Sequence, residues 1–242
     1  MKNKEFFYLQ YDKINWQNQE KTKINYLVNN FIIQQIFAKK KSKDIKIFDI
    51  GFGIGFFFKM LEKNLPKFFK DISLEGCEPS YKNYNNFKSK TFNLKKIKLR
   101  TFNKTFLDTK TDTKFDFITS IYVFPHIADD ELKETAKKIH SMLNNEGKLI
   151  LVVANEKYLE EKLKAKKDLF IEKNSIEFDG EQYKEILHYS EIPQIGTIID
   201  YNREEKFYMD LFKKNGFSLT EKKDLDDMGF ICTIFVFKKI TS

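Results

Sequence analysis

The chain has 242 residues, a length that fits one α/β domain with insertions. Its formal net charge is +8, but the 43 basic residues are spread beside 35 acids and only Arg100 and Arg203 are arginines. Because nucleic-acid readers depend on arginine for bidentate contacts, this composition argues against a nucleic-acid partner. No apolar run reaches the roughly 20 residues of a membrane span. No metal-ligand spacing is present either, so we expect a soluble, cytoplasmic protein without a metal or membrane partner, in an oligomeric state that is left open.

The N-terminal part, residues 1–44, begins with an aromatic stretch and continues with a helical pattern. Apolar residues recur at three- and four-residue steps over 16–37, which predicts an amphipathic helix. Tyr8 and Tyr11 are candidates for a lid that contacts a substrate. Alternatively, this segment only covers the edge of a sheet.

Residues 45–155 alternate between short apolar runs and amphipathic runs. This alternation predicts a parallel sheet with right-handed crossovers. The expected strands are 45–50, 73–78, 97–102, 115–120 and 148–154. The expected helices are 56–64, one opened by Pro79 and Ser80, and 129–144.

The pattern changes after residue 155, and we interpret 156–203 as an insertion over the ligand-binding edge of the sheet. It is expected to hold a helix at 156–168 and β structure at 175–203. Turn signals stand at Asp179-Gly180, Pro193 and Gly196. Residues 204–242 are expected to complete the core with a helix at 204–214 and strands at 217–223 and 230–238.

The most informative stretch is KIFDIGFGIG, residues 46–55. An apolar strand ends in glycines at alternate positions, Gly51, Gly53 and Gly55, and an amphipathic run follows. Glycines in such a turn permit positive φ and let a ligand approach the main chain. Asp49 stands at the carboxyl end of this strand, where open α/β sheets bind ligands. Glu78 ends the next strand and can accept both hydroxyls of a ribose.

The spacing G-x-G-x-G differs from the dinucleotide fingerprint G-x-G-x-x-G, because Phe56 stands where the third glycine would be. It resembles the motif of class I S-adenosylmethionine-dependent methyltransferases. The segments 115–132, 143–153 and 211–221 are similar to later strands and the last helix of that family. The resemblance implies a Rossmann-like, seven-stranded, mostly parallel sheet with an antiparallel last strand. It also implies S-adenosylmethionine as the cofactor and methyl transfer as the activity.

The resemblance further implies a cofactor site at the carboxyl edge of the sheet. The family usually has an acid after the third strand for the adenine amino group. No acid is in register here, so the side-chain oxygen of Asn103 is the candidate. Phe52 or Phe106 is a candidate to stack on adenine, and either can instead be core. The expected cofactor-binding residues are Asp49, Gly51, Phe52, Gly53, Gly55, Glu78, Pro79, Asn103, Lys104, Thr105, Phe106, Ser120 and Ile121.

The fourth-strand segment SIYVFPHI lacks the Asn/Asp-Pro-Pro-Tyr/Phe motif of enzymes that methylate base amines or glutamine amides. It is similar to small-molecule methyltransferases. We therefore expect methylation on oxygen or nitrogen of a small metabolite that can be anionic: phosphorylated, carboxylated or a sugar nucleotide. The alternatives are an RNA or protein methyltransferase and a cofactor-binding subunit without catalysis.

Two histidines are candidates for the general base, because histidine accepts protons near neutral pH. His126 follows Pro125 after the fourth strand, and His188 lies in the insertion. Each can equally be a structural residue. Arg203 can clamp an anionic group of the substrate in a bidentate pair, and Asp200 can add to the same polar pocket. Otherwise these residues are ordinary surface charges of a hairpin. The expected substrate-binding residues are Tyr8, Tyr11, Tyr122, Tyr189, Tyr201 and Arg203.

Overall fold

The computed structural model describes residues 22–38, 44–65, 71–89, 97–164, 171–192 and 196–240. The predicted roles of Tyr8 and Tyr11 and the predicted turn at Pro193 lie outside the described residues. At His188 and Tyr189 the strand backbone is described and the side chains are not. Within the described ranges, no helix combines the length and the apolar character that crossing a bilayer would require.

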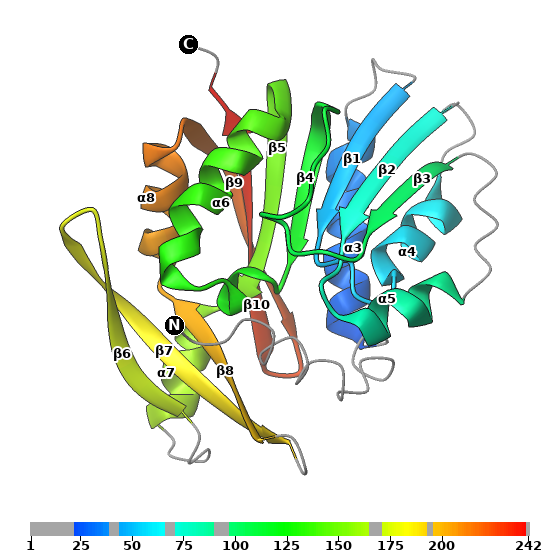
Figure 1. Ribbon diagram of the computed structural model, residues 1–242. Coiled ribbons are helices and arrows are strands. Elements are labelled where there is room, and N and C mark those ends of the chain that lie inside the picture. Colours follow the sequence, from blue (N-terminus) through cyan, green and yellow to red (C-terminus); the bar gives the residue numbers. More distant parts are fainter. Residues whose placement is uncertain are drawn as a thin grey trace.

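The core is a seven-stranded sheet in the order β3-β2-β1-β4-β5-β10-β9 (Figure 1). Strands β3, β2, β1, β4 and β5 pair in parallel, whereas β10 is antiparallel to both β5 and β9. This topology confirms the Rossmann-like sheet expected from the resemblance. Its strands are β1 (Asp44–Ile50), β2 (Asp71–Cys77), β3 (Ile97–Phe102), β4 (Phe115–Ile121), β5 (Leu143–Ala154), β9 (Phe217–Asp227) and β10 (Phe230–Lys239).

Helices cover both faces of this sheet, which explains why consecutive residues of the central strands β1 and β4 are buried. Figure 1 shows α6 and α8 on one face and α3, α4 and α5 on the other. Successive residues of β1 divide between the two layers: Phe48 joins the cluster under α6 and α8, and Ile47 joins the cluster under α3 and α4. The helices are α3 (Lys23–Ala38), α4 (Phe56–Asn64), α5 (Tyr81–Lys88), α6 (Asp129–Met142), α7 (Glu156–Lys164) and α8 (Glu205–Lys214), with a 3₁₀ turn η1 (Phe124–His126).

In the main sheet, the strand boundaries differ most from the prediction at β5 and β9. β5 begins at Leu143, five residues before the expected start, because the backbone at Leu143 is already extended and pairs with Phe115. The ladder shifts register before it continues. β9 runs to Asp227, and it turns into β10 through Met228 and Gly229, which both have positive φ (51° and 89°). Paired positive φ values are the signature of a tight type I′ hairpin.

The segment 156–203 forms α7 and a separate three-stranded antiparallel sheet in the order β6-β7-β8. The predicted turn at Asp179 and Gly180 joins its first two strands, again with positive φ at both residues (49° and 81°). β8 packs against η1, the turn that follows β4 at the carboxyl edge of the main sheet. The insertion therefore lies beside the edge where the candidate site is expected. Its strands are β6 (Ile171–Phe178), β7 (Glu181–Ile192) and β8 (Gly196–Arg203).

Candidate functional site

The glycine turn after β1 forms a tight loop against the end of β2. Gly51, Gly53 and Gly55 have φ values of 69°, 57° and 83°, a backbone region that residues other than glycine rarely adopt. The amides of Gly51 and Phe52 donate to the carbonyl of Cys77 at 2.8 and 3.2 Å. A Cβ atom added at Gly51 would lie 2.5 Å from a methyl group of Val123. The loop can therefore keep this shape only with glycine at that position.

Glu78 joins the loops that follow β1 and β2. One carboxylate oxygen accepts the amide N–H of Gly53 and the other accepts the amide N–H of Ser80, each at 2.9 Å. The residue is buried, and its own amide donates to the carbonyl of Phe102 at 3.0 Å. A carboxylate oxygen can accept two hydrogen bonds. Glu78 is thus fixed beside the glycine turn with capacity for further donors such as hydroxyl groups.

Asp49 is a buried acid one residue before the end of β1. Its side chain is almost fully enclosed and accepts the hydroxyl of Thr119 at 2.6 Å. Burial raises the pKa of the Asp49 carboxyl from 3.8 to about 7, opposed by the Thr119 hydrogen bond and reinforced by the charge of Glu78. The carboxyl of Asp49 therefore titrates near neutral pH, close to the glycine turn.

This raised pKa predicts a pH-dependent stability that Asp49→Asn removes. A folded-state pKa above the unfolded value means that the contribution of this group is most favourable below pH 3.8 and is lost as pH rises to about 7. The shift corresponds to at most about 4 kcal/mol, at roughly 1.4 kcal/mol per pKa unit. Asn keeps an acceptor for Thr119 and never ionises. Urea unfolding of both proteins from pH 4.5 to 8 should show Asp49→Asn gaining stability relative to wild type as pH rises. If the free energies of unfolding of the two proteins changed in parallel with pH, the carboxyl of Asp49 would not titrate in this range.

The segment after β3 forms hydrogen bonds with the backbone of Glu78 and Pro79. The side-chain amide of Asn103 donates to the carbonyls of Glu78 (2.8 Å) and Pro79 (3.3 Å). The hydroxyl of Thr105 donates to Asp108 at 2.6 Å, and Lys104 is exposed. Asn103 therefore already has a structural role in this loop, and its predicted contact with adenine stays a prediction.

The two candidate rings for stacking on adenine pack in the core, which is the alternative left open from the sequence. Phe52 is 5% exposed and packs against Phe58 and Phe87, with ring centroids 5.3 and 4.9 Å away. Phe106 is 6% exposed and meets the ring of Phe48 edge-on at 5.7 Å. Neither ring presents a face to a ligand.

The end of β4 holds a buried hydroxyl and a strained residue. The side chain of Ser120 is fully buried, and its Oγ has no hydrogen-bond partner in the described part of the chain. Ile121 is half-buried.

Tyr122 has a positive φ of 57°, donates its amide N–H to the carbonyl of Val152 and packs its ring against Phe230. Strained backbone of this kind is often kept at functional sites. Burial of Tyr122 also raises the pKa of its phenol well above the ordinary range, so the phenol stays neutral.

His126 ends the η1 turn and is paired with an acid from the insertion. Its Nδ1 lies 3.1 Å from an Oδ atom of Asp200 on β8, and the two side chains are 22% and 28% exposed. His188, the other predicted base, lies on β7 opposite Asp200 in the strand register. The structure thus brings the backbone of both predicted bases and Asp200 to one place beside the carboxyl end of β4.

Arg203 does not fit the predicted clamp for an anionic substrate. Its guanidinium is fully buried and donates to the carbonyls of Phe124 (3.1 Å) and Ile127 (3.0 Å). It also pairs with Asp129 at 2.6 Å and with the buried Glu185 at 3.2 Å. All sides of the fork are occupied by the protein, so Arg203 fastens β8 to the η1 turn instead of binding a ligand. Tyr201, its neighbour on β8, is half-buried with its ring 5.8 Å from the Arg203 guanidinium.

A family model described as a methyltransferase domain matches residues 23–222, which is most of the chain. The chain belongs to the methyltransferase domain family. This match confirms the resemblance drawn from the glycine turn and the later strand segments. No curated protein sequence matches the chain.

Solved methyltransferase structures share the fold at low sequence identity. An S-adenosylmethionine-dependent methyltransferase from Clostridium acetobutylicum is 16% identical, with a TM-score of 0.63 and coverage of 98% of this chain and 99% of that one. Magnesium protoporphyrin IX methyltransferase from Synechocystis, solved with bound SAH, is 14% identical, with a TM-score of 0.64 and coverage of 98% and 95%. The N-methyltransferase NodS from Bradyrhizobium japonicum, also with SAH, is 10% identical, with a TM-score of 0.65 and coverage of 97% and 98%.

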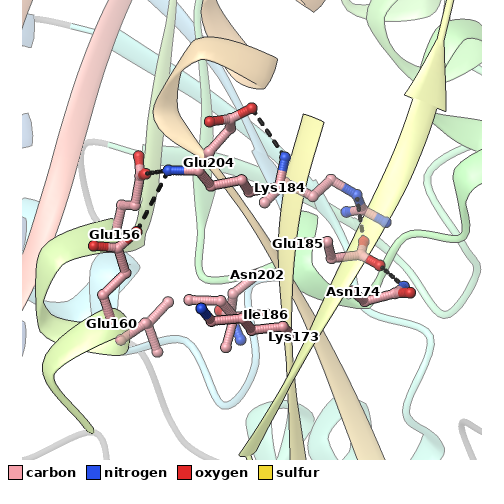
Figure 2. Close-up of a pocket in the computed structure, with 11 residues that line it drawn as sticks. Glu156, Glu160, Lys173, Asn174, Lys184, Glu185, Ile186, Asn202 and Glu204 are labelled. Carbon is pink, nitrogen blue, oxygen red and sulfur yellow. Dashed lines mark hydrogen bonds and ion pairs between the residues drawn. The ribbon is translucent and has the colours of Figure 1, made fainter. Parts of the chain in front are cut away.

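The methyltransferase also has a cavity of about 230 Å³ inside the insertion, lined by α7 and all three strands of the small sheet (Figure 2). Glu156 and Glu160 of α7 face Lys184 of β7 across it, with N–O distances of 3.9 and 3.6 Å. Deeper in, Glu185 accepts the side-chain amide of Asn174 at 2.6 Å. No residue of the glycine turn lines this cavity, so it is separate from the candidate cofactor site.

Two contacts in the methyltransferase were not foreseen from the sequence. The first is the hydrogen bond from the hydroxyl of Thr119 to Asp49. The expected parallel pairing of these two strands could have indicated it, because their register places Thr119 opposite Asp49. The pairing of Asp200 with His126 joins residues of the insertion and the core. The sequence marked both as polar candidates, but no local pattern indicates that they meet.

Proposed function

We propose that this protein transfers a methyl group from S-adenosylmethionine to an oxygen or nitrogen of a small molecule. The observation that carries the proposal is the Glu78 carboxylate, which is held by two backbone amides beside the glycine turn at the carboxyl edge of the sheet. Open α/β sheets bind their ligands at this edge. The solved neighbours crystallised with SAH support the same cofactor.

The described residues fit this cofactor. The turn carries no side chain at Gly51, Gly53 and Gly55, so a ligand can approach its backbone closely. The Glu78 carboxylate has acceptor capacity suited to the two hydroxyls of a ribose. The Ser120 hydroxyl is buried without a partner in the described part of the chain, as expected of a group that a ligand completes. Gly53, Gly55, Pro79, Asn103, Lys104, Thr105 and Ile121 remain proposed contacts around these three.

The cofactor supplies, when bound, a methyl group on a positively charged sulfur that is already activated for in-line displacement. The protein therefore has to position the acceptor and, where the acceptor carries a proton, remove it. We assign the second task to His126, which lies at the carboxyl end of β4 and is partly exposed. Its Nε2 accepts the proton that the acceptor oxygen or nitrogen loses.

The acceptor is proposed to be a small metabolite held between the carboxyl edge of the main sheet and the insertion, with Tyr122, Tyr189 and Tyr201 as candidate contacts. The net charge of +8 favours an acceptor that carries a negative group, through long-range attraction. Arg203, which was expected to bind the negative group of the acceptor, is buried and paired with Asp129 and Glu185 instead. Two buried free cysteines, Cys77 and Cys232, fit a reducing compartment such as the cytoplasm.

The test is a transfer assay with methyl-labelled S-adenosylmethionine and a cell extract that is separated afterwards into small molecules, RNA and protein. We expect the label in the small-molecule fraction, in a product that mass spectrometry then identifies. Label only in RNA or protein would replace the proposed acceptor class. Binding of SAH without transfer to any fraction would indicate a subunit that binds the cofactor and does not catalyse.

A further inference from the structure

The acid that faces His126 comes from the insertion, far from it in the chain. Asp200 lies on β8 and places an Oδ atom 3.1 Å from Nδ1 of His126. Both side chains are largely but not fully buried, at 22% and 28% exposure. The interaction therefore has a defined geometry, while solvent weakens its electrostatic part. Its main effect is expected on the orientation and tautomer of the imidazole.

A carboxylate at Nδ1 decides which ring nitrogen can act. Neutral imidazole has one N–H donor and one acceptor nitrogen, and a carboxylate partner accepts a hydrogen bond from the nitrogen that carries the proton. With the proton on Nδ1 directed at Asp200, Nε2 keeps its lone pair and can accept a proton from an acceptor molecule. The same carboxylate stabilises the imidazolium that forms afterwards.

The strand that carries Asp200 also fixes the backbone around His126. Arg203, three residues further along β8, donates to the carbonyls of Phe124 and Ile127, which flank the Pro125-His126 dipeptide. Its fully buried guanidinium is held in place by Asp129 and Glu185. Among the described residues, Asp129, Glu185 and Asp200 thus form ion pairs with Arg203 or His126 at this turn. One strand of the insertion thus fastens both the side chain and the main chain of the proposed base.

We propose that Asp200 is a positioning residue for His126, and that β8 thereby makes the insertion part of the catalytic apparatus instead of a cover alone. The proposal rests on the proposed function and on His126 as its base. It specifies the acceptor further: an alcohol, a phenol or a protonated amine, which must lose a proton. A carboxylate or phosphate oxygen would not need this pair.

The pairing itself can be tested without knowing the acceptor. In protein labelled with ¹⁵N-histidine, NMR reports which ring nitrogen carries the proton. The chain has three histidines, so loss of one signal set in His126→Ala assigns His126. We expect the proton on Nδ1 in wild type and a change of this state in Asp200→Asn, because the Asn side-chain amide can donate to Nδ1. Asp179→Asn, the same substitution at an exposed turn of the small sheet, should leave the signals unchanged.

The catalytic consequence is tested with the labelled-cofactor assay. Asp200→Asn should lower kcat by about tenfold to a thousandfold, a typical range for impaired proton transfer, while SAH affinity stays the same. In the His126→Ala background the Asp200→Asn change should have no further effect, since residues that act through one another are not additive. Asp179→Asn should retain full rate.

The outcomes separate the two proposals. A proton on Nε2 in wild type, or a tautomer that Asp200→Asn does not alter, overturns the positioning role whatever the activity. An unchanged kcat in Asp200→Asn, with His126→Ala inactive, overturns it as well. If wild type shows the pair but transfers no methyl group, the proposed function is wrong, and the catalytic part of this inference is overturned with it.

Discussion

Replacing His126 by alanine should lower kcat for methyl transfer by about 10² to 10⁴, the usual contribution of a general base. The reason is that the proton of the acceptor then has no partner at the end of β4, where Asp200 otherwise holds the imidazole. Cofactor affinity should stay nearly intact, because this side chain pairs with Asp200 of the insertion and not with the Glu78 carboxylate proposed to bind the ribose. The measurement is kcat in the labelled-cofactor assay beside the SAH dissociation constant from calorimetry.

His140 provides the matched control for that prediction. It lies in α6, where its ring packs edge-on against Phe217 and its Nε2 approaches Gly216, away from the glycine turn. His140→Gln should therefore keep the wild-type kcat in protein that remains folded. If His126→Ala turns over at full rate, the acceptor needs no base, and an acceptor that is already ionised, such as a carboxylate or phosphate oxygen, becomes the better interpretation.

Replacing Glu78 by glutamine should weaken SAH binding at least tenfold. Two charge-assisted hydrogen bonds to ribose hydroxyls are each worth roughly 1.5–3 kcal/mol, and tenfold corresponds to about 1.4 kcal/mol. Glutamine has nearly the same shape but only one acceptor oxygen. Its amide group would face the N–H of either Gly53 or Ser80, both of which now donate to the carboxylate. Calorimetric titration with SAH measures the change.

The control for Glu78→Gln is the same substitution at Glu62, a partly exposed residue of α4 outside the candidate site. Glu62→Gln should bind SAH like wild type. Circular dichroism and the urea midpoint show whether Glu78→Gln remains folded, since loss of two backbone partners also strains the loop. Unchanged SAH affinity in a folded Glu78→Gln protein would remove the ribose assignment.

The sequence predicted the elements whose signals are local. The strand, glycine turn and helix over residues 45–64 follow from an apolar run, three glycines and an amphipathic run, and the structure has β1, the turn and α4 there. The Asp179-Gly180 turn follows from residues that tolerate positive φ. In each case one short stretch of chain contains the whole physical reason.

Features that depend on distant partners were not predictable in the same way. Arg203 reads as a substrate clamp when it is considered alone. Its partners come from η1, α6 and β7, and only the folded chain brings them around one guanidinium. Phe52 and Phe106 similarly stand in loops where the sequence suggests contact with a ligand. In the structure, neighbouring aromatic residues pack against both rings. Burial at such positions is decided by tertiary packing.

The central claim is that S-adenosylmethionine binds at the glycine turn with its ribose on Glu78. A crystal structure of the protein with SAH tests this most directly. We expect both ribose hydroxyls within hydrogen-bonding distance of the Glu78 carboxylate, and the cofactor's main-chain contacts along the turn from Gly51 to Gly55. Well-defined SAH density elsewhere, such as in the cavity between α7 and the small sheet, with the glycine turn unliganded, would contradict the account.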